Sequence, residues 1–268
     1  MSKLSIGRAW EETASFLKHE TRLVLPIALA TFAIPSALAT WANPGGERAS
    51  QSGIGTVLTF LVLVAALIGQ MAIAGLASGR RESVGEILRL SFRRVWGLFA
   101  SYLILFAPIV LVAMLILGTL LSSRGLTDPA SVTPEALAEI PAVGAILLAI
   151  LLIFVVIAIR MFPGAAIAIN ETSRPMTLIR RNWQITKGNS LRLLGVVVGI
   201  FLAALVLGLA ATAVIGSVLT LVSGAPEPFS LSALLLGLAS GAVSAAVTAT
   251  AAALVGRIYV QLADRPAA

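Results

Sequence analysis

The run IPAVGAILLAILLIFVVIAI at residues 140–159 decides the fold class of this chain. It carries no charge and is long enough for one helix to cross a bilayer, which takes about 20 apolar residues. Backbone polar groups inside a bilayer must be paired within the protein, so such a run predicts a helix. Five further uncharged runs of similar or greater length occupy residues 23–46, 49–79, 95–123, 193–226 and 228–256. We therefore predict an all-α polytopic integral membrane protein with six transmembrane helices.

The composition of the whole chain supports this interpretation. Hydrophobic residues make up 58% of the 268 residues and charged residues 12%, against about 25% charged residues in soluble domains. The mean hydropathy is +0.99. A soluble domain of this size cannot bury so much apolar surface, and disordered chains combine low hydrophobicity with high net charge. We predict a single transmembrane domain over residues 1–268 and exclude a soluble enzyme.

The basic residues are distributed unevenly between the two sides of the predicted membrane. All but two of the 19 Lys and Arg residues lie at the two ends of the chain or in the second and fourth connections between spans; the exceptions are Arg48 and Arg124. Basic residues are enriched on the cytoplasmic side of membrane proteins, so both termini are predicted to be cytoplasmic. In the third connection, Thr133-Pro134-Glu135 has the pattern of a helix start and predicts a short surface helix.

An amphipathic stretch precedes each odd-numbered span, at residues 5–18, 83–94 and 174–188. Each has an apolar face at helical spacing and a charged opposite face, which predicts three helices lying along the inner leaflet. A capping box formed by Ser83 and Glu86 is predicted to start the second of them. The three apolar faces stay in register with one another: Ile6, Ala9, Trp10, Thr13, Ala14 and Leu17; Val84, Ile87, Leu88, Ser91, Phe92 and Val95; Pro175, Leu178, Ile179, Asn182, Trp183 and Thr186.

Each even-numbered span carries one strongly polar side chain near its cytoplasmic end, namely Gln70, Arg160 and Arg257. Together with the amphipathic stretches, this pattern predicts a threefold repeat of an amphipathic helix plus a transmembrane hairpin. The repeats span residues 5–75, 83–165 and 174–262. The alternative is that spans rich in Ala and Leu align by composition alone.

The same three side chains form the predicted ligand site. Equivalent positions of a threefold repeat meet around a common centre, so we expect Gln70, Arg160 and Arg257 to converge on a cytoplasmic-side pocket for an anionic lipid headgroup. Glu171 is the predicted counter-ion of Arg160. In the alternative interpretation, Arg160 reaches the headgroups as a flanking charge and Glu171 only caps a helix. The predicted membrane-interface anchors are Trp10, Trp96, Trp183, Arg180, Arg181 and Lys187.

One segment resembles a known family. It contains Arg160-Met161-Phe162-Pro163-Gly164, then Asn170-Glu171, and then the stretch LIRRNWQITKGN at residues 178–189. These residues resemble the membrane domain of the glycerophosphoryl diester phosphodiesterase membrane-domain family and related uncharacterised six-span bacterial inner-membrane proteins. The resemblance implies an all-helical six-span bundle in the bacterial cytoplasmic (inner) membrane. It does not imply the esterase activity, because the catalytic domain is absent from this chain.

Catalytic and metal-binding patterns are missing from the sequence. There is no Cys and a single His, His19, and no phosphate-binding loop, zinc-binding or serine-hydrolase motif occurs. We predict no enzyme activity, no metal and no cofactor, and we expect membrane lipids rather than nucleic acid as partners. The preferred function is a lipid-interacting or envelope-related scaffold. The alternative is a transporter or channel-like protein for a small anionic or amphiphilic solute, and a second copy or another membrane protein is left open as a partner.

Overall fold

The computed structural model describes residues 4–43, 53–124, 140–224 and 227–263, and every element found in them is a helix. Six helical stretches in these ranges are long and apolar enough to cross a membrane, which confirms the predicted all-α fold with six spans. The helices are α1 (Ile6–His19), α2 (Thr21–Ala28), η1 (Leu29–Ala33), α3 (Ile34–Ala42), α4 (Gly53–Ala77), α5 (Val84–Ser123), α7 (Pro141–Met161), α8 (Gly164–Asn170), α9 (Pro175–Thr186), α10 (Ser190–Ser223) and α11 (Leu231–Ala263). The predicted surface helix at Thr133-Pro134-Glu135 lies outside the described residues.

The three amphipathic stretches are helical, but they join their spans in different ways. Two of them form separate short helices, α1 and α9. The stretch at residues 83–94 is instead the beginning of α5, which continues without a break into its span. The predicted capping box starts this helix: Glu86 N donates to Ser83 Oγ, and Ser83 N donates to the Glu86 carboxylate at 2.9 Å. No proline follows until Pro108, so nothing ends the helix at the start of the span.

Equivalent positions on the apolar faces of the three amphipathic stretches have similar burial. Ala9, Ile87 and Leu178 each have 0% relative exposure. One turn further on, the polar residues Thr13, Ser91 and Asn182 have 1%, 0% and 0%. The register read from the sequence therefore describes the buried edge of all three helices.

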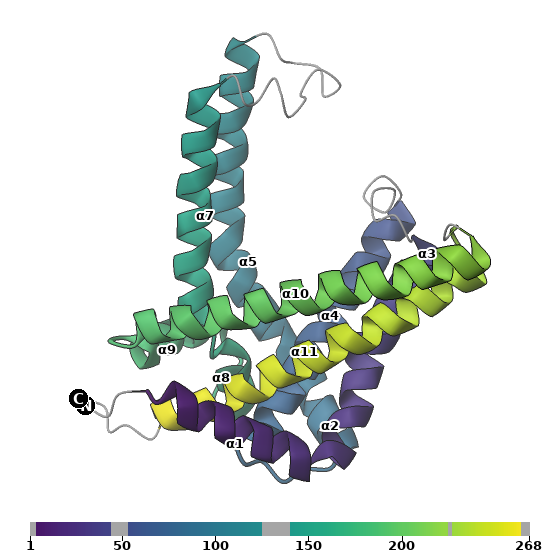
Figure 1. Ribbon diagram of the computed structural model, residues 1–268. Coiled ribbons are helices and arrows are strands. Elements are labelled where there is room, and N and C mark those ends of the chain that lie inside the picture. Colours follow the sequence, from purple (N-terminus) through teal and green to yellow (C-terminus); the bar gives the residue numbers. More distant parts are fainter. Residues whose placement is uncertain (1–3, 44–52, 125–139, 225–226, 264–268) are drawn as a thin grey trace.

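Each of these helices packs on an even-numbered span of a different predicted repeat. The beginning of α5 packs on α4, where a Cβ at Gly75 would lie 3.1 Å from Ile87 Cδ1. Helix α9 packs on α7 and α8, and α1 packs on α11. The first and last helices of the chain thus lie together, and Ser5 N donates to Gln261 Oε1 at 3.3 Å. The beginning of α1 and the end of α11 are accordingly neighbours in Figure 1.

Small residues bring α11 close to the first span. A Cβ at Gly237 would lie 2.6 Å from the carbonyl oxygen of Ala37, and one at Gly241 would lie 2.7 Å from that of Ala33. Such contacts between backbones are typical of helix pairs in membranes, where Gly and Ala allow close approach. On α10, by contrast, Gly199 faces open space, because nothing lies within 4 Å of a Cβ added there.

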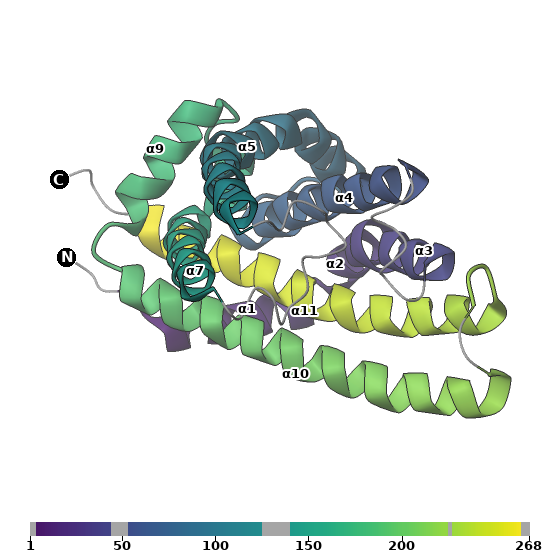
Figure 2. The same ribbon diagram turned by 90° about the horizontal axis from the view of Figure 1, so that it is seen from above.

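The hairpins point in different directions. In Figure 1 the outer part of α5 and all of α7 rise together, whereas α10 and α11 run across them; Figure 2 shows α7 end-on and α10 lengthwise. The outer part of α5 is covered by few neighbours, and Leu111, Met114 and Leu115 are 60%, 67% and 61% exposed. Side chains of this kind match the hydrocarbon interior of a bilayer.

A short buried helix joins the hairpins at their base. The fourth span breaks at Phe162 and Pro163, where a proline cannot continue the α-helical bonding pattern, and resumes as α8. Every residue of α8 from Gly164 to Ile169 is buried. This helix contacts α4, α5, α9 and α11, so it links parts of all three predicted repeats.

Candidate functional site

The four predicted ligand residues lie in separate surroundings. Among the described residues, no hydrogen bond or salt bridge joins any two of Gln70, Arg160, Glu171 and Arg257. Gln70 on α4 is half-buried. A cavity that is lined by Arg257 includes neither Gln70 nor Arg160 in its lining. The convergence expected from a threefold repeat is therefore not seen in the contacts of these side chains, and headgroup binding by each of them stays a prediction.

Arg160 and Arg257 instead each reach the amphipathic helix that packs on their own span. Arg160 Nη1 donates to Thr186 Oγ1 on α9 at 3.3 Å, and its Cζ lies 5.8 Å from the ring centroid of Trp183. Arg257 Cζ lies 5.3 Å from the ring centroid of Phe16 on α1. These are cation–π distances. The two guanidinium groups therefore contact different short helices, Arg160 on α9 and Arg257 on α1.

Glu171 has a different partner from the one predicted. Its carboxylate accepts two hydrogen bonds from Arg181, from Nε at 2.8 Å and from Nη2 at 3.2 Å, and a third from Tyr259 OH at 2.9 Å. The prediction that Glu171 is the counter-ion of Arg160 is therefore wrong. Arg181 lies one helix away on α9, and its planar guanidinium fits a carboxylate with two parallel bonds. Glu171 thus joins the end of α8 to both α9 and α11.

Two arginines of the second connection cap α8, a role that the sequence did not indicate. Arg94 Nη1 donates to the carbonyl oxygens of Ala168 and Ile169 at 3.2 and 2.9 Å, and Arg80 Nη1 donates to that of Ile169 at 3.1 Å. The last carbonyls of a helix lack partners within it and carry partial negative charge, so cations are favourable there. Arg80 also pairs with Glu82 at 2.9 Å. The only signal in the sequence was the cluster of five arginines, which is also the pattern of a lipid-facing loop.

The predicted interface anchors are exposed, with one exception. Trp10, Trp96 and Trp183 are 51%, 49% and 38% exposed. Arg180 and Lys187 are exposed as well. Arg181 is half-buried and bound to Glu171, so its guanidinium is engaged within the protein.

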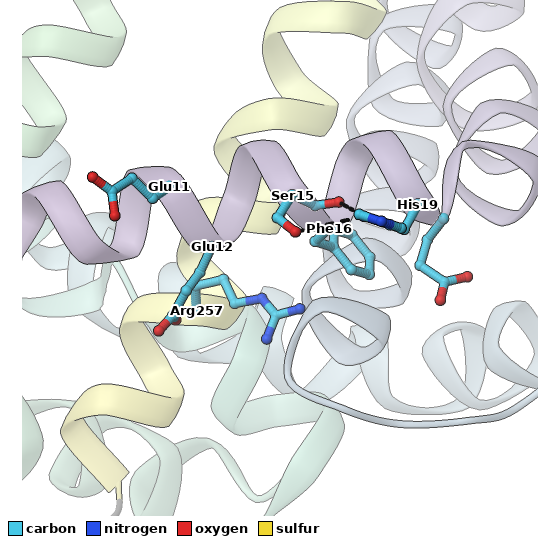
Figure 3. Close-up of a pocket in the computed structure, with 7 residues that line it drawn as sticks. Glu11, Glu12, Ser15, Phe16, His19 and Arg257 are labelled. Carbon is cyan, nitrogen blue, oxygen red and sulfur yellow. Dashed lines mark hydrogen bonds between the residues drawn. The ribbon is translucent and has the colours of Figure 1, made fainter.

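A cavity of about 450 Å³ opens between α1 and α11. Its lining consists of Glu11, Glu12, Ser15, Phe16, His19, Glu20 and Arg257. Figure 3 shows the Arg257 side chain extending from α11 to the ring of Phe16, with Glu11 pointing away from it. His19 Nδ1 lies 2.7 Å from the carbonyl oxygen of Ser15, so the imidazole is held against its own helix. Within the described ranges, no group of three or more acidic or His side chains has the arrangement needed to hold a metal ion.

The comparisons with known proteins give a family but no function. Neither a curated protein nor a solved structure matches the chain. A family of uncharacterised domains matches residues 4–262, nearly the whole chain. This match fits the expectation of an uncharacterised family, while the relation to the glycerophosphoryl diester phosphodiesterase membrane domain stays a resemblance. On this match, the chain belongs to the family described as domain of unknown function DUF7847.

Proposed function

We propose that this protein is a non-enzymatic multi-pass component of the bacterial cytoplasmic (inner) membrane that binds anionic lipid headgroups on its basic face. It would act as a lipid-interacting or envelope-related scaffold. Both termini would lie in the cytoplasm, where most of the Lys and Arg residues would face the anionic inner leaflet.

The observation that carries this proposal is the two-sided character of the three amphipathic helices. Each has a buried edge and, beside it, an exposed apolar edge: Trp10 on α1 is 51% exposed, Phe92 on α5 55%, and Trp183 on α9 38%. Exposed basic side chains occur on the same helices, including Arg89, Arg93 and Arg180. Aromatic rings next to basic groups suit the headgroup layer, where the ring is partly buried and the charge meets phosphate.

A scaffold is favoured over an enzyme by the way in which the polar groups are used. Glu171 accepts from Arg181 and Tyr259, and Arg80 and Arg94 donate to the end of α8. The bonds of Glu171 join the end of α8 to two helices of the following repeat. The bonds of Arg94 and Arg80 join the same end to α5 and to the connection before it. Each group is thereby used to hold the base of the protein together, and none is placed as an activated nucleophile or general base.

The threefold repeat is part of the proposal. Residues 5–75, 83–165 and 174–262 would be three copies of one unit, with each amphipathic helix packed on the second span of the preceding unit. The contacts of α5 with α4, of α9 with α7 and of α1 with α11 support this order and close it into a ring. The matched burial of Thr13, Ser91 and Asn182 supports it independently.

A transporter is favoured by one feature, the broken fourth span. In many transporters the ends of such broken helices bind ions or substrate at the middle of the membrane. Here the carbonyl groups at the end of α8 already accept hydrogen bonds from Arg80 and Arg94. These carbonyl groups are therefore poorly suited to bind a cation. We therefore place the transport function second.

The proposed lipid binding can be tested with two charge-matched double variants. Arg89→Gln/Arg93→Gln removes two exposed positive charges from the basic face, and Arg48→Gln/Arg124→Gln removes two from the other predicted side. Each would be titrated with phosphatidylglycerol in nanodiscs of neutral lipid. A basic residue near an anionic surface contributes about 1 kcal/mol, so the first variant should bind roughly tenfold or more weakly. Equal losses in the two variants would contradict a binding face on one side.

A further inference from the structure

The cavity between α1 and α11 holds an arginine without a partner. Arg257 Nε is buried and has no hydrogen-bond acceptor, and the guanidinium forms none of the salt bridges found in the described residues. The guanidinium lies over the face of Phe16, with Cζ 5.3 Å from the ring centroid. Four other arginines on this side, Arg80, Arg94, Arg160 and Arg192, each donate to an oxygen of the protein. A buried donor without an acceptor is unfavourable, so Arg257 is suited to an acceptor supplied from outside the chain.

The carboxylates of the same cavity are only partly neutralised. Glu12 pairs with Arg8 at 2.8 Å. Glu11 and Glu20 form no salt bridge with any described residue, and Glu20 makes no capping hydrogen bond at the start of α2. Because Glu11 points away from Arg257 in Figure 3, Glu20 is the free carboxylate that we assign to the cavity together with Arg257.

This pair of charges selects the chemistry of a ligand. A simple anion would be attracted by Arg257 but repelled by the carboxylates. A simple cation would be attracted by the carboxylates but repelled by Arg257. A group that carries both a phosphate and a protonated amine satisfies both. The cavity of about 450 Å³ has room for a group of that size.

We propose that the α1–α11 cavity binds the headgroup of an aminophospholipid such as phosphatidylethanolamine, with the phosphate at Arg257 and the ammonium at Glu20. The lipid source rests on the proposed function, which places α1 and its exposed Trp10 at the headgroup layer. The site differs from the basic face in its ligand, because a zwitterion rather than an anion is preferred.

The test uses the full-length protein in nanodiscs of phosphatidylcholine that contain a photoreactive lipid. Two probes with the same acyl chain are compared, one with an ethanolamine and one with a glycerol headgroup, and labelled peptides are identified by mass spectrometry. The ethanolamine probe should label α1 and the end of α11 several-fold more strongly than the glycerol probe. In Glu20→Gln this preference should disappear, and in Arg257→Gln labelling by both probes should fall about tenfold, as expected for loss of a charged hydrogen bond.

Two controls separate the outcomes. Glu227→Gln removes a carboxylate that lies outside the cavity and should leave the labelling unchanged. Glu20→Gln alters a side chain without a described bond, so it keeps the test valid if Arg257→Gln fails to fold.

Equal labelling by the two probes in the unmodified protein would overturn the proposal, and so would loss of the ethanolamine labelling on addition of an equimolar amount of soluble phosphoethanolamine, since the ligand would then not be a lipid. Failure of the basic-face proposal would be seen in phosphatidylglycerol binding to the Arg89/Arg93 variant, which this labelling does not measure.

Discussion

Arg94 on α5 donates a hydrogen bond from Nη1 to the carbonyl oxygen of Ile169 near the end of α8, at 2.9 Å. This bond ties the buried helix α8 to the other span of the same hairpin. The substitution Arg94→Gln removes the positive charge that faces the carbonyl end of α8. We expect the free energy of unfolding to fall by about 1–3 kcal/mol, as for other hydrogen bonds that involve a charged group. Thermal unfolding followed by tryptophan fluorescence in detergent would measure it. The control is Arg93→Gln, an exposed neighbour without a described bond, and a similar loss in that variant would contradict the capping role.

The pair formed by Glu171 and Arg181 should show measurable coupling. Their side chains are 28% and 32% exposed, so solvent weakens the interaction. A double-mutant cycle with Glu171→Gln and Arg181→Gln should give a coupling of about 0.5–1 kcal/mol in the free energy of unfolding. The same cycle with Arg160→Gln in place of Arg181→Gln should give a value near zero. A larger coupling of Glu171 to Arg160 would restore the pairing that the sequence suggested.

Two glycines of α5 should respond oppositely to the same substitution. A Cβ at Gly97 would overlap the carbonyl oxygen of Ser173, a backbone atom that cannot move away cheaply, whereas nothing lies within 4 Å of a Cβ at Gly118. Gly97→Ala should reduce stability by about 1–3 kcal/mol or prevent folding. Gly118→Ala should be neutral or slightly stabilising, because Ala favours helix. The yield and the melting temperature of the two variants, measured in the same detergent, test this difference in stability. Matching values would contradict the close approach of α5 to the segment before α9.

Buried serines of α5 provide a similar comparison. Ser91 and Ser101 are both fully buried, but Ser91 Oγ has no hydrogen-bond partner, while Ser101 Oγ donates to the carbonyl oxygen of Gly97 at 2.7 Å. Ser91→Ala should leave stability unchanged or raise it, and Ser101→Ala should lower it by about 1 kcal/mol. The melting temperatures should therefore separate. If Ser91→Ala proves the more damaging, the hydroxyl of Ser91 has a partner, such as water, that remains to be located.

The orientation in the membrane can be tested with reporter fusions. Fusions after Gly46, Leu126 and Ala225 should report the outer side, and fusions after Gly79 and Ser173 the cytoplasm. The physical basis is the concentration of basic residues in the second and fourth connections. An alkaline phosphatase reporter, active outside, and a fluorescent protein, active inside, give complementary signals. A cytoplasmic signal from the Leu126 fusion would overturn the topology.

Local patterns in the sequence predicted local structure well. The six spans follow from uncharged length, the start of α5 from Ser83 and Glu86, and the buried edges of three helices from helical spacing. Each of these depends on residues within a few turns of one another. The small residues Gly237 and Gly241 allow the close approach of α11 to the first span, but nothing local in the sequence tells which helix is the partner.

The partners of charged side chains could not be predicted in the same way. Glu171 lies near Arg160, Arg174, Arg180 and Arg181 in the chain, and only the direction of α9 after the turn decides which guanidinium meets it. Arg80 and Arg94 likewise read as lipid-facing charges until α8 is placed against them. Helical spacing tells which face is buried, but it does not tell which neighbour covers that face.

The contact of Phe16 with Arg257 can form only after the last helix of the chain has been synthesised. When α1 leaves the ribosome, the span that it packs on has not yet been made. About 240 residues must follow, which takes roughly 12–50 s at about 5–20 residues per second. During that interval the apolar stripe of α1 has to rest on something other than α11, and the membrane surface is the nearest apolar phase. Synthesis of the last span would then draw α1 from the lipid onto the protein and close the ring of helices in a single late step.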